Sequence, residues 1–393
     1  MIEKEILGRD QSYARAVNNE LVIQKLRERD YSATDLANDL NLSHAAISSI
    51  LKGLVNDNII RASYSGSTAG KGRKRVFYSL NEAYGLIIVV SLSNNRYEII
   101  ISNIREEILL EFEKEITNYD VATIYEIVLK IKDILMMVEY RDIPLRSIII
   151  AVPGRVNAIT GELQLSKHFD ADLFDGKNSI KNIFSKYFDA PITLDNDINL
   201  SIIGEMKCGC LKSINNAMLA YIDNGIGGAL IIDGKFYGGD NGYAGEFGLM
   251  HTSFHGEESY LDEFASLRSI KEYAKKKFNR SFVVNDLVKE YEKHGVLYDY
   301  INETAHLVGK KLRDVIELLN VSHVVISGRV SLFGIDYLNH VNEEVNKSKN
   351  TTIVEYSKLS KKSILIGAIS KSVEQSIPHM SGNIKSTQVK VGE

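Results

Sequence analysis

The stretch that decides the fold is Tyr221-Ile-Asp-Asn-Gly-Ile-Gly-Gly-Ala-Leu-Ile-Ile-Asp-Gly-Lys-Phe-Tyr-Gly-Gly-Asp-Asn-Gly-Tyr-Ala-Gly-Glu-Phe-Gly-Leu249. An apolar strand is expected to run into Gly225-Ile-Gly-Gly228, and a second strand is expected at Ala229 to Ile232. Asp233-Gly234 then predicts the tight turn of a β-hairpin, because this pair supplies the positive φ angles that such a turn needs. The later glycines let the backbone pass close to a ligand, and the carboxylate of Glu246 is held among them. Glycine-rich loops also occur in tight β-structure, so these residues alone leave a ligand site and a structural loop open.

Two motifs in this stretch together resemble a known signature. Gly225-Ile-Gly-Gly228 is followed about twenty residues later by Ala244-Gly-Glu-Phe-Gly248, and this order and spacing are similar to those of the ROK family of sugar kinases and sugar-responsive repressors. The resemblance covers nearly the whole chain. It implies an α/β two-lobed actin-like ATPase and sugar-kinase (ribonuclease H-like) fold, with a cleft between the lobes.

The length and composition of the chain are those of a globular protein. It has 393 residues, of which 44% are hydrophobic and 25% charged, and this length allows two or three domains. It contains no apolar run of about eighteen residues, and Met1 to Asp10 is too polar for a signal peptide. These features predict a cytoplasmic protein. The two cysteines, Cys208 and Cys210, are too few for a disulfide framework.

The N-terminal part is more basic than the rest and carries a pattern of short helices. Residues 1–80 contain 12 Lys and Arg against 9 Asp and Glu, whereas the remainder contains 35 against 42, an asymmetry expected where one end meets nucleic acid. Asn19 to Arg29 has apolar residues at helical spacing, and Ser32-Ala-Thr-Asp35 predicts a capping box. Asn41-Leu42 predicts a turn before a helix that Ser43 caps. This pattern indicates a helix-turn-helix, although a plain three-helix bundle would also produce it.

A basic hairpin after these helices favours DNA binding. Gly70-Lys-Gly-Arg-Lys-Arg75 lies between the strand-like runs Ile59 to Ser63 and Val76 to Leu80. This arrangement predicts the wing of a winged helix, whose arginines suit phosphates or a narrow minor groove. A charge run alone is more often a solvated surface, but here it follows a helix-turn-helix pattern. The expected DNA contacts are Ser43, His44, Ala45, Ser48, Ser49 and Lys52 on the second helix of the motif, and Lys71, Arg73, Lys74 and Arg75 in the wing.

The resemblance also indicates where a kinase would bind ATP. In kinases of this fold, an Asp-x-Gly-Gly-Thr loop in the first β-hairpin holds the metal and lets backbone amides reach the nucleotide phosphates. The corresponding residues here are Ser91-Leu-Ser-Asn-Asn95, which lack the carboxylate and both glycines. We therefore predict a disabled ATP site, no cofactor and no enzymatic activity.

The expected sugar-binding residues come from the same resemblance. Asn196-Asp197 matches a family pair whose aspartate is the general base for the sugar hydroxyl in kinases and a hydrogen-bond acceptor in repressors. From the residues alone, an Asn-Asp turn that caps the next helix is an equally good interpretation. The resemblance favours sugar contact by Asn196 and Asp197. It adds Glu246 of the Ala-Gly-Glu motif, and Asp262, which stands where the family has a second Glu.

The family's zinc ligands are missing. Relatives carry zinc after the Ala-Gly-Glu motif, through a His and a cysteine-rich knuckle. Here the His position is Leu249, and Met250 to Tyr260 contains no cysteine. Cys208-Gly-Cys210 has no close His and gives an incomplete tetrahedral site. Because His251 and His255 are expected on a surface loop, we predict no structural zinc and no metal site.

The C-terminal half is predicted to be mainly helical. It includes a single helix at Leu261 to Lys277, a buried strand at Val321 to Ser327 and a final helix at Ser363 to Gln375. The residues from Ser376 onward are polar and are expected to form a frayed tail.

Together these observations predict two domains. Residues 1–80 form a winged helix-turn-helix DNA-binding domain, and residues 81–393 form a two-lobed domain for sugar binding and oligomerisation. We interpret the chain as a regulator, in particular a repressor, of sugar-utilisation genes, resembling the repressors of xylose operons. Its expected partners are double-stranded operator DNA, a small sugar and further copies of itself in a homodimer or higher symmetric oligomer. The alternatives are an active sugar kinase with Asp197 as base, and a DNA-binding protein with an inactive pocket.

Overall fold

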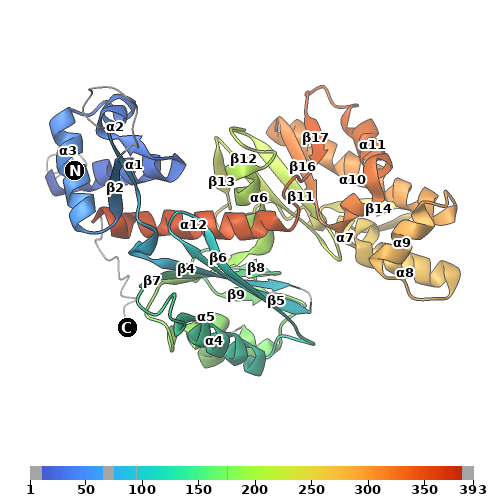
Figure 1. Ribbon diagram of the computed structural model, residues 1–393. Helices are drawn as coiled ribbons and strands as arrows, with labels where there is room; N and C mark the ends of the chain where they lie inside the picture. The colour runs from blue at the N-terminus through green and yellow to red at the C-terminus, as the bar shows by residue number, and fades with distance from the viewer. Residues whose placement is uncertain (1–10, 65–74, 94, 175, 383–393) are drawn as a thin grey trace, which may run out of the picture.

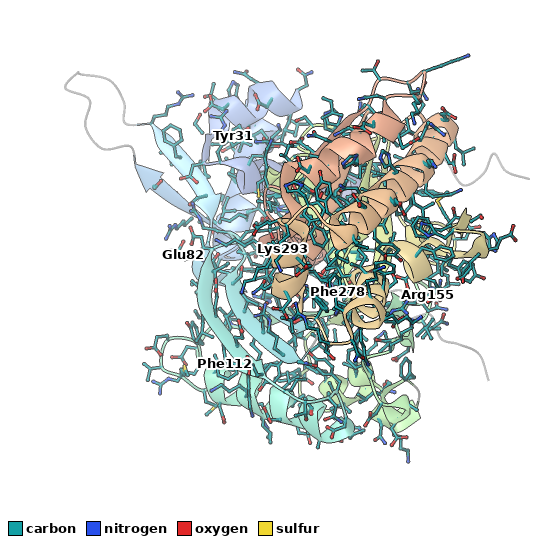
Figure 2. The ribbon with its side chains drawn as sticks, turned by 90° about the vertical axis from the view of Figure 1, so that its right-hand side faces the viewer. Tyr31, Glu82, Phe112, Arg155, Phe278 and Lys293 are labelled. Carbon is teal, nitrogen blue, oxygen red and sulfur yellow. The ribbon has the colours of Figure 1, made fainter. Side chains whose placement is uncertain are left out.

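The computed structural model describes residues 11–64, 75–93, 95–174 and 176–382, and arranges them as an N-terminal unit and two α/β lobes (Figure 1). Seen from the side, the three parts are marked by Tyr31 in the N-terminal unit, Phe112 in the first lobe and Phe278 in the second (Figure 2). In the described part of the chain, no helix is both long enough and apolar enough to cross a membrane.

The N-terminal unit contains three helices and a small antiparallel sheet. Its helices are α1 (Gln11–Glu28), α2 (Ala33–Leu40) and α3 (His44–Asn56), and its strands β1 (Tyr31–Ser32), β2 (Ile60–Tyr64) and β3 (Val76–Leu80) lie in the order β1-β3-β2. Ser32 and Asp35 form the predicted capping box, and the side chain of Ser43 accepts a hydrogen bond from the amide of Ala46. These caps confirm both predicted helix starts, because they satisfy amides that the first helical turn leaves unpaired.

The first lobe is built on a five-stranded sheet in the order β10-β7-β4-β5-β6. One face is covered by helices α4 and α5, and the other by helices α6 (Asp197–Cys208) and α12 (Lys362–Ser381). Because both faces are covered, its central strands are almost continuously apolar instead of alternating. Its elements are β4 (Leu86–Ser93), β5 (Arg96–Asn103), β6 (Ile108–Glu115), α4 (Val121–Leu135), β7 (Leu145–Val152), the small hairpin β8 (Arg155–Val156) and β9 (Leu163–Leu165), α5 (Ile180–Ser185) and β10 (Ile192–Asn196).

The second lobe repeats this topology in the order β13-β12-β11-β16-β17. In both sheets the first three strands in sequence are antiparallel neighbours, a fourth strand pairs in parallel with the first, and a fifth pairs in parallel with the fourth. Its strands are β11 (Ala217–Ile222), β12 (Ile226–Ile232), β13 (Lys235–Tyr237), β16 (His323–Ser327) and β17 (Ile353–Tyr356), with the separate hairpin β14 (His251–Phe254) and β15 (Glu257–Tyr260). Its helices are α7 (Leu261–Ala265), α8 (Leu267–Phe278), α9 (Val284–Tyr291), α10 (Val296–Leu319) and α11 (Gly334–Val345).

Helices α6 (Asp197–Cys208) and α12 (Lys362–Ser381) pack together between the two lobes. Their backbones approach closely at two glycines. A β-carbon at Gly204 would lie 2.0 Å from the backbone oxygen of Ser363, and one at Gly367 would lie 1.8 Å from that of Leu200. Any larger side chain would therefore push the helices apart.

The end of α12 packs against the N-terminal unit, so the prediction of a frayed tail is wrong for Ser376 to Ser381, and the residues after Gly382 lie outside the described residues. Ile377 and Met380 are buried in the same apolar cluster as Ile23 and Leu26 of α1. The side-chain Nδ2 of Asn19 also donates to the backbone oxygen of Ser381 at 3.1 Å. Sequence reasoning missed this contact because the buried face of α12 combines apolar residues with several serines, which resemble a polar tail.

Two further local predictions need correction. The helix expected at Leu261 to Lys277 is broken at Ser266, whose extended backbone lets its side chain cap α8. The loop expected at His251 and His255 is a β-hairpin, with its turn at His255-Gly256, where both residues have positive φ. Both histidines are exposed, as predicted.

Candidate functional site

The two glycine motifs pack directly against each other in the second lobe. A β-carbon at Gly248 would lie 2.2 Å from the backbone oxygen of Ile226, and one at Gly245 would lie 2.7 Å from that of Gly228. Gly227 and Gly228 lie within β12 and pair with β11, so most of the first motif is strand and not a turn before one. The predicted hairpin turn at Asp233-Gly234 is confirmed, with φ angles of 51° and 71°.

Glu246 forms an ion pair that joins the two lobes. Its Oε1 atom lies 2.8 Å from Nε of Arg155, which comes from β8 in the first lobe. Both side chains are about one third exposed. Beside this pair, the amide of Ala158 donates to the backbone oxygen of Asn241 at 3.4 Å. The Ala-Gly-Glu segment therefore closes against the β8–β9 hairpin.

Asn196 caps helix α6, as the alternative interpretation from the sequence proposed. Its side-chain oxygen accepts hydrogen bonds from the amides of Ile198 and Asn199 at 2.9 and 3.2 Å, and its Nδ2 donates to the backbone oxygen of Gly154 at 2.8 Å. The second Nδ2 hydrogen is the remaining group that a ligand could use.

Asp197 is the first residue of α6, and its protonation is shifted by its surroundings. Although the side chain retains some solvent exposure, burial and, to a smaller extent, the charges of Asp223 and Asp195 raise the pKa of Asp197 to about 7. Hydrogen bonds from backbone amides at the helix start oppose this shift. A carboxyl group with this pKa can accept or donate a hydrogen bond near neutral pH.

Asp262 forms a hydrogen bond to the first glycine motif. Its Oδ1 atom accepts a hydrogen bond from the amide of Ile226 at 2.6 Å, and its Oδ2 atom lies 2.7 Å from Nη2 of Arg268. Arg268 also pairs with Glu263. The structure therefore brings Asp262 to the motif that contains Gly225, but both of its oxygens already have partners. Sequence reasoning missed Arg155 and Arg268, because neither belongs to a motif that suggested pairing with an acid.

A second ion pair lies at the carboxyl ends of β11 and β16. The guanidinium of Arg329 binds the carboxylate of Asp223 through several hydrogen bonds, one of them from Nε to Oδ2 at 2.8 Å. Burial tends to raise the pKa of Asp223, but Arg329 outweighs that effect and holds the pKa below its ordinary value. The ends of parallel strands are where ligands bind in open α/β sheets, and here an internal ion pair occupies that position.

The region expected to have lost ATP binding is a tight hairpin. Strand β4 pairs with β5 in register as far as Ser93 and Arg96. The hydroxyl of Tyr119 donates to the backbone oxygen of Ser93 at 2.8 Å. The backbone at the end of β4 is therefore held by protein groups and lacks the glycines that would let amides approach phosphates.

A pocket of about 550 Å³ lies away from the predicted sugar residues. It is lined by the C-terminal part of α6, the residues around the start of β13, and α12, including Met206, Lys207, Phe236 and Lys371. The predicted sugar contacts instead surround the start of α6 and the two glycine motifs.

The predicted DNA-contacting residues of α3 share one exposed face. Ile47, Ile50 and Leu51 are buried on the opposite face. The six exposed residues are Ser43, His44, Ala45, Ser48, Ser49 and Lys52. Among the predicted wing residues, Lys71, Arg73 and Lys74 lie outside the described residues. Arg75 pairs with Asp35 of α2 at 2.7 Å, which ties the base of the hairpin to the helices.

A partly buried carboxylate connects the N-terminal unit to α6. Oε1 of Glu106 lies 2.7 Å from Nη2 of Arg27 in α1 and 2.9 Å from Nζ of Lys207 in α6. Nη2 of Arg27 also donates to the backbone oxygen of Ser370 in α12 at 3.1 Å. The side chain of Glu106 is 16% exposed. Sequence reasoning missed this network because its members are far apart in the chain and belong to no motif.

The two lobes, their repeated topology and the two helices between them form a fold that this chain shares with solved sugar kinases. Residues 90–371 match the model of the ROK family, and the chain belongs to that family. The resemblance predicted from the glycine motifs is thereby confirmed.

Comparisons with individual proteins place this chain near both regulators and kinases of the family. It is 24% identical over 383 residues to a xylose repressor from Caldicellulosiruptor bescii, covering 89% of this chain and 94% of the relative. A solved ROK family transcriptional regulator, described as a homolog of the E. coli MLC protein, matches with a TM-score of 0.79 at 18% identity over 94% of this chain and 98% of its own. A ROK hexokinase from Thermus thermophilus matches with a TM-score of 0.61 at 16% identity over 72% of this chain and 96% of its own.

Proposed function

We propose that this protein is a DNA-binding transcriptional repressor whose operator affinity is reduced by a small sugar. The observation that carries this proposal is the connection from α6, which begins at Asp197, through Lys207 and Glu106 to Arg27 of the N-terminal unit. The similarity to xylose repressors over most of the chain supports it. We place the domain boundary near residue 80, and as a repressor the protein would act in the cytoplasm.

Residues 1–80 are proposed to be a winged helix-turn-helix. Helix α3 is the recognition helix, because its outer face carries small polar side chains and Lys52, which suit base edges and phosphates. Strands β2 and β3 form the base of the wing, and the basic residues between them would contact the phosphate backbone. One such unit reads one half-site, so a homodimer or higher symmetric oligomer on a palindromic operator follows.

The sugar is proposed to bind between the start of α6 and the Ala-Gly-Glu segment. Asp197 and Glu246 would accept hydrogen bonds from its hydroxyls, with Asn196 and Asp262 at the edge of the site. Glu246 pairs with Arg155 across the lobes, so a hydroxyl that competes for this carboxylate would change the contact between them. Only a ligand that binds two closures of the lobes unequally can shift their populations.

The route from the sugar to the DNA is proposed to run along α6 and α12. A displacement of α6 would move Lys207, whose ammonium shares the Glu106 carboxylate with Arg27. Helix α12 would follow, because Gly204 and Gly367 leave no space between the two helices. The C-terminal end of α12 packs against α1, so the position of the recognition helix would depend on the closure of the lobes.

A sugar kinase is the second candidate, and the observation that favours it is Asp197. A carboxyl group whose pKa is about 7 is suited to general-base catalysis near neutral pH. The hairpin at Ser93 and the Asp223–Arg329 pair oppose this candidate, because they occupy positions where a kinase would need free backbone amides and space for phosphates.

DNA binding is tested by a pair of charge reversals. Lys52→Glu places a negative charge on the exposed face of α3, and Lys212→Glu makes the same change at an exposed site outside the N-terminal unit. Binding of the full chain to DNA from its own promoter region is measured over a range of salt concentrations. We expect Lys52→Glu to weaken binding and reduce its salt dependence, while Lys212→Glu retains both. Equal binding by the two variants would overturn the assignment of α3.

A further inference from the structure

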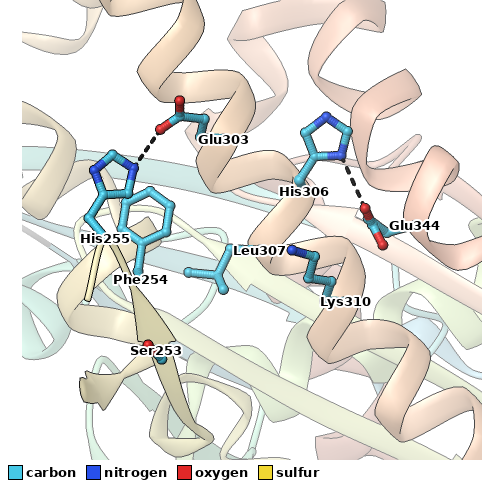
Figure 3. A pocket seen from close by; sticks show the side chains of 8 residues that line it. All are labelled: Ser253, Phe254, His255, Glu303, His306, Leu307, Lys310 and Glu344. Carbon is cyan, nitrogen blue, oxygen red and sulfur yellow. Dashed lines mark hydrogen bonds and ion pairs between the residues drawn. The ribbon is translucent and has the colours of Figure 1, made fainter. Parts of the chain in front are cut away.

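Helices α10 and α11 bring two histidines and a glutamate together on a side of the second lobe that the proposed function does not use. His306 comes from α10, and His340 and Glu343 are one turn apart on α11. One ligand atom from each of the three lies within 4.8 Å of the other two. His306 also lines a pocket of about 440 Å³ with Glu344 and Lys310 (Figure 3).

The distances fit a small coordination sphere. Oε2 of Glu343 lies 3.6 Å from Nε2 of His306 and 3.6 Å from Nδ1 of His340. In a tetrahedral zinc site with bonds of about 2.0–2.1 Å, ligand atoms are roughly 3.3 Å apart. Small side-chain rotations would therefore place all three atoms around one ion. Two imidazoles and one carboxylate leave a fourth position for water, the ligand set of an open zinc site.

One ring nitrogen of each histidine lacks a hydrogen-bond partner among the described residues. Nδ1 of His306 and Nδ1 of His340 are both buried, and neither makes a hydrogen bond within the described part of the chain. A buried polar atom without a partner costs free energy, so its presence calls for an explanation such as an ion. A metal bound to Nδ1 of His340 would give that atom a ligand bond.

The second buried nitrogen has a candidate outer partner. Nδ1 of His306 lies 3.5 Å from Oε1 of Glu344, the ion-pair contact drawn in Figure 3. Histidines that bind metal through one nitrogen usually donate the other N–H to a carboxylate, which fixes the ring and its tautomer. Coordination through Nε2 would put the proton on Nδ1 and tighten this contact. Lys347 and Arg313 hold the Glu344 carboxylate in place.

We propose that His306, His340 and Glu343 form a binding site for a divalent transition-metal ion of the Zn²⁺ class, with Glu344 orienting His306. Imidazole ligands favour zinc and its neighbours over Mg²⁺ or Ca²⁺, which prefer all-oxygen sites. The charges of Lys310, Lys347 and Arg313 oppose a cation here, and the carboxylates of Glu343 and Glu344 offset part of that opposition. Sequence analysis predicted no metal site. It missed this one because the three ligands come from two helices, at positions that belong to no metal motif.

In the test, a chelator first removes any bound metal from the full chain. The chain is then titrated with Zn²⁺, and calorimetry measures the binding. Co²⁺ is used in parallel, because its visible absorption reports tetrahedral coordination. We expect one ion per chain in the wild type and a higher unfolding temperature when the ion is bound. His340→Ala and His306→Ala should abolish stoichiometric binding, and Glu344→Gln should weaken it by about 10- to 100-fold.

His255→Ala is the matched control. His255 lines the same pocket, but it pairs with Glu303 and does not belong to the three-residue cluster. This variant should bind Zn²⁺ like the wild type. Alanine is favourable in helices, so the variants at His306 and His340 should fold, and circular dichroism without metal checks this. The proposal is overturned if the wild type binds no stoichiometric ion, or if His340→Ala and His255→Ala bind it equally.

Discussion

The two sides of the lobed domain differ in what they share with a sugar kinase. On the side that would hold the nucleotide, the β4–β5 hairpin pairs as far as Ser93, and Arg329 is bound to Asp223. On the side that would hold the sugar, both carboxylates of the family pattern are present. Asp197 lies at the start of α6, and Glu246 lies in the second glycine motif. We infer from this difference that the chain retains groups suited to recognise hydroxyls and lacks groups suited to hold phosphates.

The largest expected effect is the absence of phosphoryl transfer. With ATP and Mg²⁺, turnover of any hexose or pentose should be at least about a thousandfold below the roughly 1–100 s⁻¹ of ordinary kinases. The reason is that Ser91 to Asn95 contains neither the carboxylate nor the glycines of the kinase loop, and that Tyr119 binds the backbone oxygen of Ser93. A coupled assay for ADP over a panel of sugars measures this. Turnover at kinase rates that is lost in Asp197→Asn would show that the nucleotide side still binds ATP, and would contradict the difference between the two sides.

The glycine motifs next to the proposed sugar site are also needed for packing. Gly248→Ala would place a β-carbon 2.2 Å from the backbone oxygen of Ile226, and we expect it to reduce the free energy of unfolding by about 1–3 kcal/mol. Gly53→Ala, inside α3 and with its nearest contact 3.5 Å away, should instead increase it by about 0.5–1 kcal/mol. Denaturant unfolding compares the two. A Gly248→Ala protein as stable as the wild type would contradict the close packing of the motifs.

The network at Glu106 should carry part of the response to the sugar. Glu106→Gln removes the charge that Arg27 and Lys207 share, so operator binding without sugar should persist while the change produced by sugar shrinks by about 2- to 30-fold. Glu107→Gln is the control, because this neighbour is 56% exposed and pairs with Arg105. Operator titrations of both variants with and without sugar measure this change. If Glu106→Gln responds to sugar like Glu107→Gln, the coupling takes another route.

The smallest expected effect is on pH dependence. The pKa of Asp197 is raised to about 7, so its carboxylate is mostly protonated at pH 6 and mostly ionised at pH 8. Because the ionised form accepts hydrogen bonds from hydroxyls better, sugar affinity should rise by up to about tenfold between these pH values. Asp197→Asn should flatten the profile. Calorimetric titration at both pH values measures it, and a flat wild-type profile would exclude Asp197 as an acceptor whose ionisation matters.

The same pKa shift has a defined sign for stability. Asp197 holds its proton more tightly in the folded chain than in the unfolded chain. Its protonated form therefore stabilises the fold at acid pH, and this contribution is lost as the pH rises through about 7. Asp197→Asn should accordingly raise the unfolding midpoint relative to wild type more at pH 8 than at pH 5.

Sequence reasoning predicted the parts of the molecule that depend on local chemistry. The capping box at Ser32 and the turn at Asp233-Gly234 follow from side chains and φ preferences of neighbouring residues, and both are confirmed. The two-lobed α/β fold followed from the family resemblance, and the buried strand predicted at Val321 to Ser327 followed from its apolar run. Within the site, the helix-capping role of Asn196 was one of two interpretations that the residues left open, and the structure shows the cap.

The features that sequence reasoning missed depend on contacts between distant segments. Arg155 pairs with Glu246, and Glu106 joins α1 to α6, although nothing near either residue in the chain indicates a partner. The burial of Ile377 and Met380 was missed because α1 supplies the apolar surface that covers them. Such pairings are set by the packing of the lobes, which a linear pattern does not encode.

The most direct test of the account is an operator titration with and without the sugar that stabilises the protein in a thermal-shift screen of sugars and sugar phosphates. For the wild type, a coupling of about 1–3 kcal/mol predicts that a small neutral sugar weakens operator binding roughly 5- to 150-fold. Asp197→Ala should remove this response and leave sugar-free DNA binding intact. A sugar that binds tightly to the wild type but leaves its operator affinity unchanged would contradict the proposed coupling between the two sites.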